Sequence, residues 1–389
     1  MRKYVSVLCL IILLLCLISP VVAQDAHDMA REQADKIDLG DIEAFWIELE
    51  RESGEYLPDF NWREVFSWFR PDGASVLSLS EVFNGLWRFL WREIVINLNL
   101  LGKLLFLAVV AALLKNLEKA FANESIAVLT QSVVYLALIM IAMQSFSVAI
   151  GLGRQTVNSL VEFMLAVIPL LLTLLASLGN MASAAIFRPL IIFAVNAIAA
   201  MVRDFVFPLI FCTTILGITN HISPRVTVGK LSELFKNVAI WTMGISMTIF
   251  TGLMSIHGVA SSVGNAVTIR TAKFMAGAFL PVAGKMLADS VETVASATLI
   301  LKNSVHIVSV IIIFYLVIFP LLKVLALVFI YKLAAAIIQP LGETSLCDCL
   351  NTMGNCLSLV FAALGVVSVV FYLAITIIAG AGNASVMLR

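Results

Sequence analysis

Long apolar segments separated by short polar ones make up most of the chain from residue 98 onward. Six of these segments are long enough to cross a bilayer: 98–117, 126–150, 184–219, 238–258, 305–331 and 357–379. A run of about 18 or more apolar residues is typical of a transmembrane helix, because the hydrocarbon core is thick and holds no water to pair with backbone groups. The pattern therefore predicts an all-α polytopic membrane protein with about six spans.

Two further apolar segments, 160–179 and 271–290, each contain a proline, Pro169 and Pro281. Proline removes a helical hydrogen bond, so we expect both segments to be re-entrant or half-membrane elements. The alternative is that both segments cross the bilayer, which gives eight spans. Basic residues favour the cytoplasmic side. Six spans place the basic loop 219–237 on that side, whereas eight spans place it outside.

The spacing of the prolines also indicates an internal duplication. Pro169 and Pro281 are 112 residues apart, and Pro208 and Pro320 are separated by the same 112 residues. Pro208 and Pro320 each lie within the tripeptide Phe-Pro-Leu. These offsets predict a repeated unit of about 110 residues and make the four prolines candidate helix-break positions. The two repeats cover about 159–259 and about 270–381.

The N-terminus is typical of a signal peptide, which we place at residues 1–23. Arg2 and Lys3 form a basic start, an apolar stretch follows at 5–18, and Pro20 precedes a possible cleavage point after Ala23. These are the three parts that a secretory signal requires. An uncleaved membrane anchor is the alternative.

The following region, 24–97, is acidic and rich in aromatic residues. Between residues 24 and 100 there are 16 acidic and 7 basic residues, and five of the six tryptophans lie between residues 46 and 91. Tryptophan favours the membrane interface. We therefore expect an extracytoplasmic region that ends in an interfacial aromatic helix and leads into a membrane domain at 98–389, whose first spans cover 98–150.

Charged residues inside the apolar part are candidates for lining a conduit, because ionised side chains within a span usually face protein or water. Arg203 and Asp204 lie inside one predicted span. A second group surrounds Pro281 and consists of Arg270, Lys273, Lys285, Asp289 and Glu292. For this second group, an amphipathic helix on the outer membrane surface is the alternative.

The residues that carry chemistry in enzymes do not form recognisable motifs here. Cys347, Cys349 and Cys356 lie in the loop 332–356, predicted to be cytoplasmic, with a spacing that is not that of a zinc site. The sequence contains neither a nucleophile elbow nor a phosphate-binding loop, and it lacks a basic and aromatic patch for nucleic acid. It therefore predicts no catalytic site, no cofactor, no metal and no nucleic-acid partner.

Several long motifs resemble the stage III sporulation protein AE family of endospore-forming bacteria. The motifs are VTIRTAKF (267–274), YKLAAAIIQPLG (331–342), DCLNTMGN (348–355) and ITIIAGAGNASVMLR (375–389). The resemblance covers nearly the whole chain and is weakest before residue 75.

This resemblance implies a multi-pass protein of the mother-cell membrane that surrounds the forespore. It also implies membership of a transenvelope channel complex, together with ring-forming membrane proteins and a separate cytoplasmic ATPase. Two roles follow from it. The protein forms or borders a conduit, or it is a non-conducting platform that anchors the other components.

Overall fold

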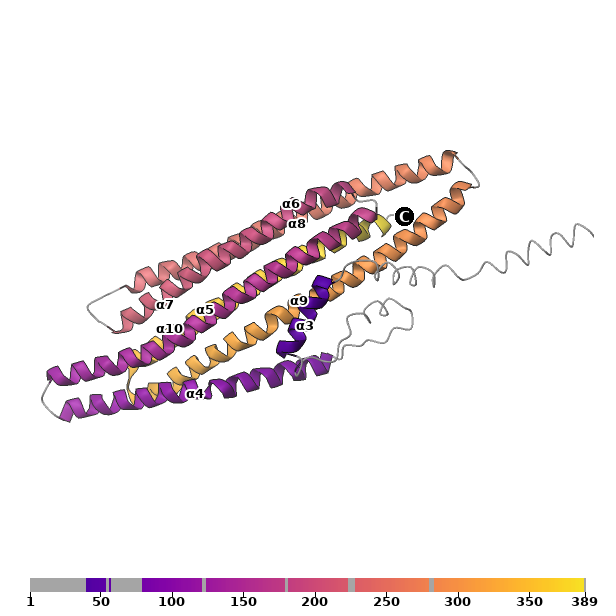
Figure 1. Ribbon diagram of the computed structural model, residues 1–389. Coiled ribbons are helices and arrows are strands. Elements are labelled where there is room, and N and C mark those ends of the chain that lie inside the picture. The colour runs from indigo at the N-terminus through magenta and orange to yellow at the C-terminus, as the bar shows by residue number, and fades with distance from the viewer. Residues whose placement is uncertain are drawn as a thin grey trace, which may run out of the picture.

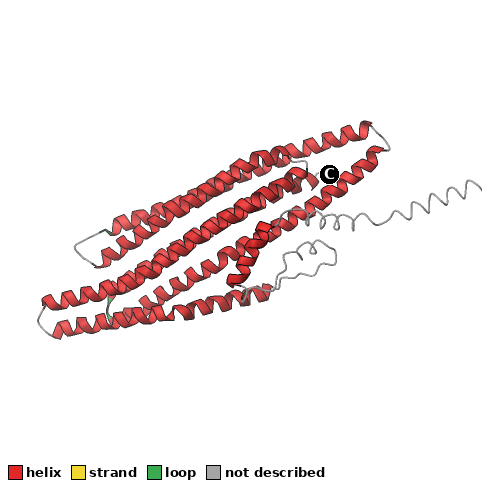
Figure 2. Cartoon of the chain, viewed as in Figure 1, coloured by secondary structure: helices red, strands yellow, loops and turns green. Residues whose placement is uncertain are grey.

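The computed structural model is a bundle of long helices that run alternately in opposite directions (Figure 1, Figure 2). It describes residues 40–53, Tyr56, 79–120, 124–178, 181–222, 228–279 and 283–387, and within these ranges all regular structure is helical. The elements are α3 (Gly40–Ser53), α4 (Leu79–Ala120), α5 (Glu124–Ser177), α6 (Met181–Met201), the π-helical turn η2 (Val202–Val206), α7 (Phe207–Ile222), α8 (Gly229–Phe279), α9 (Ala283–Ile338), the 3-10 turn η3 (Gln339–Leu341) and α10 (Thr344–Met387).

Six stretches of the described helices are long and apolar enough to cross a membrane, as the sequence predicts. They are Ser80–Leu114, Val133–Ser177, Arg188–His221, Gly229–Ile256, Thr293–Leu341 and Thr344–Gly380. Each of them overlaps one of the six predicted spans. The prediction of a polytopic helical membrane protein is confirmed.

The structure differs from the sequence prediction at 160–179. Up to Ser177 this segment is the end of α5, and the helix continues from residue 150 through Pro169 without a break. It therefore contains no hairpin up to Ser177, and its half-membrane character stays a prediction. The reason for the continuous helix is packing: the apolar neighbours Ile168 and Leu171 are fully buried, and close contact with the surrounding helices holds α5 together across the proline.

The other candidate helix-break positions behave differently from one another. Pro320 lies inside the continuous helix α9, so it does not break the helix. Pro208 directly follows the π-helical turn η2, so the helix is irregular there. Pro281 lies outside the described residues. The segment 271–290 contributes backbone to the end of α8 and the start of α9, and its re-entrant character, like the duplication, stays a prediction.

The predicted boundary between the N-terminal region and the membrane domain does not coincide with the end of a helix. Residues 1–23, the predicted signal peptide, lie outside the described residues. Helix α4 runs from Leu79 to Ala120 and crosses the predicted boundary at 97/98 without interruption. Helix α3 packs against α5 and α9 on the side of the bundle (Figure 1). Its residues Ile42 and Trp46 are buried in this contact.

Helix α10 forms the centre of the bundle because it packs against α5, α7, α8 and α9. Many of its inward residues are small or branched and have no exposed surface, among them Ala363, Leu364, Val367 and Ala374. Small residues let helix backbones approach closely within a membrane. The interior of the bundle is therefore filled with apolar side chains.

The connection between α9 and α10 is a tight turn fixed by polar contacts. Gly342 has a φ of 81° and its N–H bonds to the carbonyl of Gln339 at 3.2 Å. The next residue, Glu343, is fully buried and accepts a hydrogen bond of 2.7 Å from the hydroxyl of Tyr135 on α5. The turn thus joins the central helix to α5.

We expect Gly342→Ala to destabilise the protein by about 1–2 kcal/mol, because a side chain disfavours the left-handed backbone. Gly365→Ala is the matched control, since Gly365 lies inside α10 with open space around it. It should stabilise the helix by about 0.5–1 kcal/mol. Thermal melting of the detergent-solubilised protein measures both changes. Equal melting temperatures for the two variants would contradict this account of the turn.

Candidate functional site

A polar stripe crosses the middle of the apolar helix α5. It consists of Arg154, Gln155, Asn158, Ser159 and Glu162, at positions i, i+1, i+4, i+5 and i+8. This spacing places all five on one broad face of the helix. The stripe lies near the centre of the candidate span Val133–Ser177. Arg154, Gln155 and Glu162 are exposed.

On one side of the stripe, Asn158 contacts the charged pair Arg203 and Asp204. The guanidinium of Arg203 donates from Nε and Nη2 to the two carboxylate oxygens of Asp204, each at 2.9 Å. Its Nη1 donates to Oδ1 of Asn158, also at 2.9 Å. The two charged side chains are 38% and 60% exposed, although they lie at the centre of the candidate span Arg188–His221.

The π-helical turn η2 sets the position of this pair. Pro208 has no N–H to offer the carbonyl of Asp204, and its ring needs space in the preceding turn, so the wider π-helical turn accommodates it. Immediately after the turn, the buried ring of Phe207 packs against Gly153 on α5. A Cβ on Gly153 would lie 2.9 Å from this ring, so glycine allows the two helices to meet here.

On the other side of the stripe lies a cavity of about 380 Å³ between α3, α4, α5 and α9. We call it the polar cavity. Its polar lining consists of Glu48 from α3, Gln155, Thr156, Ser159 and Glu162 from α5, and Lys323 from α9. The wall also includes Pro320 and the aromatic residues Phe45, Phe89, Tyr315 and Phe319.

Aromatic contacts hold α3 over the polar cavity. The ring of Phe45 meets that of Phe163 on α5 edge to face, with 5.3 Å between centroids. Trp46 meets Tyr315 on α9 in the same way at 6.3 Å. Such pairs are worth about 0.5–1.5 kcal/mol beyond the apolar area that they bury. They position Glu48, one turn further along the chain, at the cavity.

The three ionised groups of the polar cavity are not joined to one another. Among the described residues, no ion pair of 4.0 Å or less involves Glu48, Glu162 or Lys323. Two carboxylates and one ammonium group are therefore available to a bound molecule.

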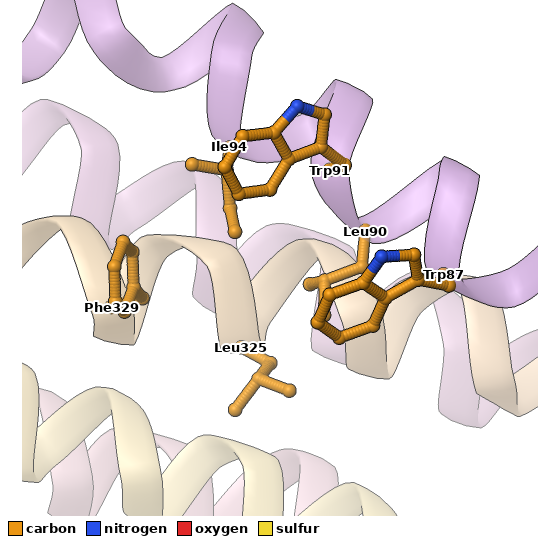
Figure 3. A pocket seen from close by; sticks show the side chains of 6 residues that line it. All are labelled: Trp87, Leu90, Trp91, Ile94, Leu325 and Phe329. Atoms are coloured by element: carbon orange, nitrogen blue, oxygen red, sulfur yellow. The ribbon is translucent and has the colours of Figure 1, made fainter.

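A second cavity, about 320 Å³ in volume, has a different chemistry. It lies between α4 and α9 and is lined by Trp87, Leu90, Trp91, Ile94, Leu325 and Phe329 (Figure 3). Trp87 and Trp91 are 58% and 60% exposed. The lining is apolar, and the sequence predicts that these tryptophans lie at the membrane interface.

A buried lysine lies elsewhere in the bundle. Lys302 on α9 has no exposed surface, and its Nζ donates to the carbonyl of Ala379 on α10 at 2.6 Å. This bond crosses between two membrane-spanning helices and pairs a charge that lipid could not accommodate.

The predicted site residues are brought together only in part. Arg203 and Asp204 form one cluster with a partner on α5, while the side chains of Arg270, Lys273, Lys285, Asp289 and Glu292 lie outside the described residues. Sequence reasoning missed the α5 stripe because it treated 151–159 as a break between two apolar segments. The helical spacing of its polar residues is the signal that identifies it.

Comparison with known proteins decides the family. Residues 61–382 match the family described as stage III sporulation protein AE. The chain belongs to the stage III sporulation protein AE family. It is similar to the stage III sporulation protein AE of Bacillus subtilis (strain 168), with 38% identity over 367 residues that cover 94% of this chain and 92% of that protein. No solved structure matches this member of the family.

We expect Asp204→Asn to lower the amount of membrane-inserted protein severalfold, because it leaves Arg203 without its carboxylate in the middle of a span. The control is Glu233→Gln, which breaks the exposed ion pair with Lys230 at 3.1 Å near the start of α8. An exposed pair contributes little to stability, so this variant should accumulate normally. Quantitative immunoblots of membrane fractions measure both amounts. Similar losses in both variants would contradict a special role for the mid-span pair.

Proposed function

We propose that this protein is an integral membrane subunit of a sporulation-specific transenvelope channel complex between the mother cell and the forespore, and that it borders a conduit. The family supports the link to sporulation. The observation that carries the conduit is the exposure of charged residues at mid-span, above all Arg203 and Asp204. Lipid solvates such groups poorly, so their surroundings are water or protein.

The packing of the bundle indicates where such a conduit runs. The centre is occupied by α10, whose inward side chains are apolar and buried. A path through the middle of one chain would require this core to separate. We therefore place the conduit along the outer face formed by the α5 stripe and η2, where several copies or partner subunits complete its wall.

The alternative role is that of a non-conducting platform, and helix length favours it. Helix α5 has 54 residues, so it is about 80 Å long, whereas the hydrocarbon core is about 30 Å thick. Part of the bundle therefore extends beyond the hydrocarbon core or is enclosed by other proteins. In this role the mid-span polar face is a docking surface for the other components.

The partners are ring-forming membrane proteins of the same complex and a separate cytoplasmic ATPase. The location is the mother-cell membrane around the forespore. They rest on the family alone.

Cysteine accessibility distinguishes the conduit from the platform. In a variant without the six native cysteines, Arg154→Cys should react with a charged, water-soluble thiosulfonate in membranes isolated from sporulating cells, because a conduit is hydrated. Phe193→Cys is the control, since Phe193 is 72% exposed on an apolar face of α6 and should face lipid. A thiol at 154 that reacts no faster than one at 193 would exclude a water-filled path and leave the platform.

The direction of insertion is tested in the same cysteine-free background. With six spans and basic loops inside, Glu233→Cys and Asn351→Cys lie on the cytoplasmic side, and Arg188→Cys lies on the opposite side; all three positions are exposed. When the protein is expressed in vegetative cells, so that it inserts into the outer cell membrane, an impermeant thiol reagent added outside their protoplasts should label only the cysteine at 188. Labelling at 233 or 351 would reverse the proposed orientation.

A further inference from the structure

The polar cavity has the composition of a binding site for a small charged molecule. Its three ionised groups come from three separate helices: Glu48 from α3, Glu162 from α5 and Lys323 from α9. These groups are far apart in the sequence, and Glu48 joins the other two only because α3 docks on the bundle. They do not neutralise one another through ion pairs within 4.0 Å.

The charges of the polar cavity determine which charges a matching ligand carries. Two carboxylates and one ammonium leave the cavity with an excess of one negative charge. Glu48 and Glu162 are exposed and Lys323 is half-buried, so a small solute can reach all three groups. A ligand that pairs with all three groups carries one carboxylate and two cationic groups.

The size and the wall of the cavity restrict the ligand further. A volume of about 380 Å³ lies at the small end of the range of ligand sites, which is about 300–1,000 Å³. Phe45, Phe89 and Phe319 provide an apolar wall for an alkyl chain. Gln155 and Ser159 provide hydrogen-bonding groups that orient polar ends.

The geometry points to a binding site for a small basic amino acid, or a molecule with the same arrangement of one carboxylate and two cationic groups on a short alkyl chain. Lys323 pairs with the carboxylate of the ligand. Glu162 and Glu48 pair with its two cationic groups. Because Glu48 belongs to α3, the site is complete only when α3 is docked. The inference concerns binding and does not require that the protein conduct the ligand.

The test uses the purified full-length protein in nanodiscs of phosphatidylglycerol, a lipid without an amino group that could compete for the site, and empty nanodiscs of the same lipid give the blank for adsorption of the cationic probes. Isothermal titration calorimetry compares three probes. L-lysine carries all three groups, cadaverine lacks the carboxylate, and L-norleucine lacks the second cationic group. We expect L-lysine to bind at least about tenfold more tightly than either of the others, because each missing group leaves a charge of the site unpaired.

Matched variants assign the interaction to the three residues. Glu48→Gln and Glu162→Gln should each weaken L-lysine binding about tenfold. Lys323→Gln should weaken it similarly and also abolish the preference for L-lysine over cadaverine, a change of selectivity that general unfolding would not produce. Glu233→Gln and Lys230→Gln are the controls, since both residues are exposed on α8 and lie outside the cavity lining.

The outcomes separate this inference from the proposed function. No heat of binding with any of the three probes, or L-lysine binding that is unchanged in all three cavity variants, overturns the site. Cysteine accessibility at residue 154 tests the conduit independently of L-lysine. Binding that depends on the three residues, in a protein whose residue 154 is not hydrated, supports the site and contradicts the conduit.

Discussion

Hydrocarbon cannot solvate an ionised side chain, and this constraint shapes the middle of the bundle. The candidate spans contain Arg154, Glu162, Arg203, Asp204 and Lys323 at positions well inside their ends. The structure accommodates four of them in two ways. Arg203 and Asp204 pair with each other and with Asn158 on α5, and Glu162 and Lys323 face a cavity. Much of the surface of these charged side chains is nevertheless exposed. Water or other proteins must therefore surround this part of the chain.

Helix α5 connects the two polar regions. One side of its polar stripe contacts the π-helical turn η2, and the other side lines the polar cavity beneath α3. A change in the position of α5 would therefore alter both regions at once.

The central position of α10 limits how the chain can function alone. Its apolar face fills the bundle, and its start is joined to α5 through the turn that holds Glu343 against Tyr135. A filled centre makes a single copy a poor pore.

The sequence by itself determined the helical class, the six apolar spans and the family, because apolar length and long motifs are local properties of a chain. It also identified Arg203 and Asp204, since charges within an apolar run are visible without any fold. It failed at Pro169 and Pro320, because a local rule about proline does not include the burial of the neighbouring side chains that keeps these helices intact. Only the tertiary structure decided that α3 docks on the bundle and that Glu48, Glu162 and Lys323 share one cavity. The physical reason is that these contacts join residues more than a hundred positions apart, and their proximity depends on how the helices pack.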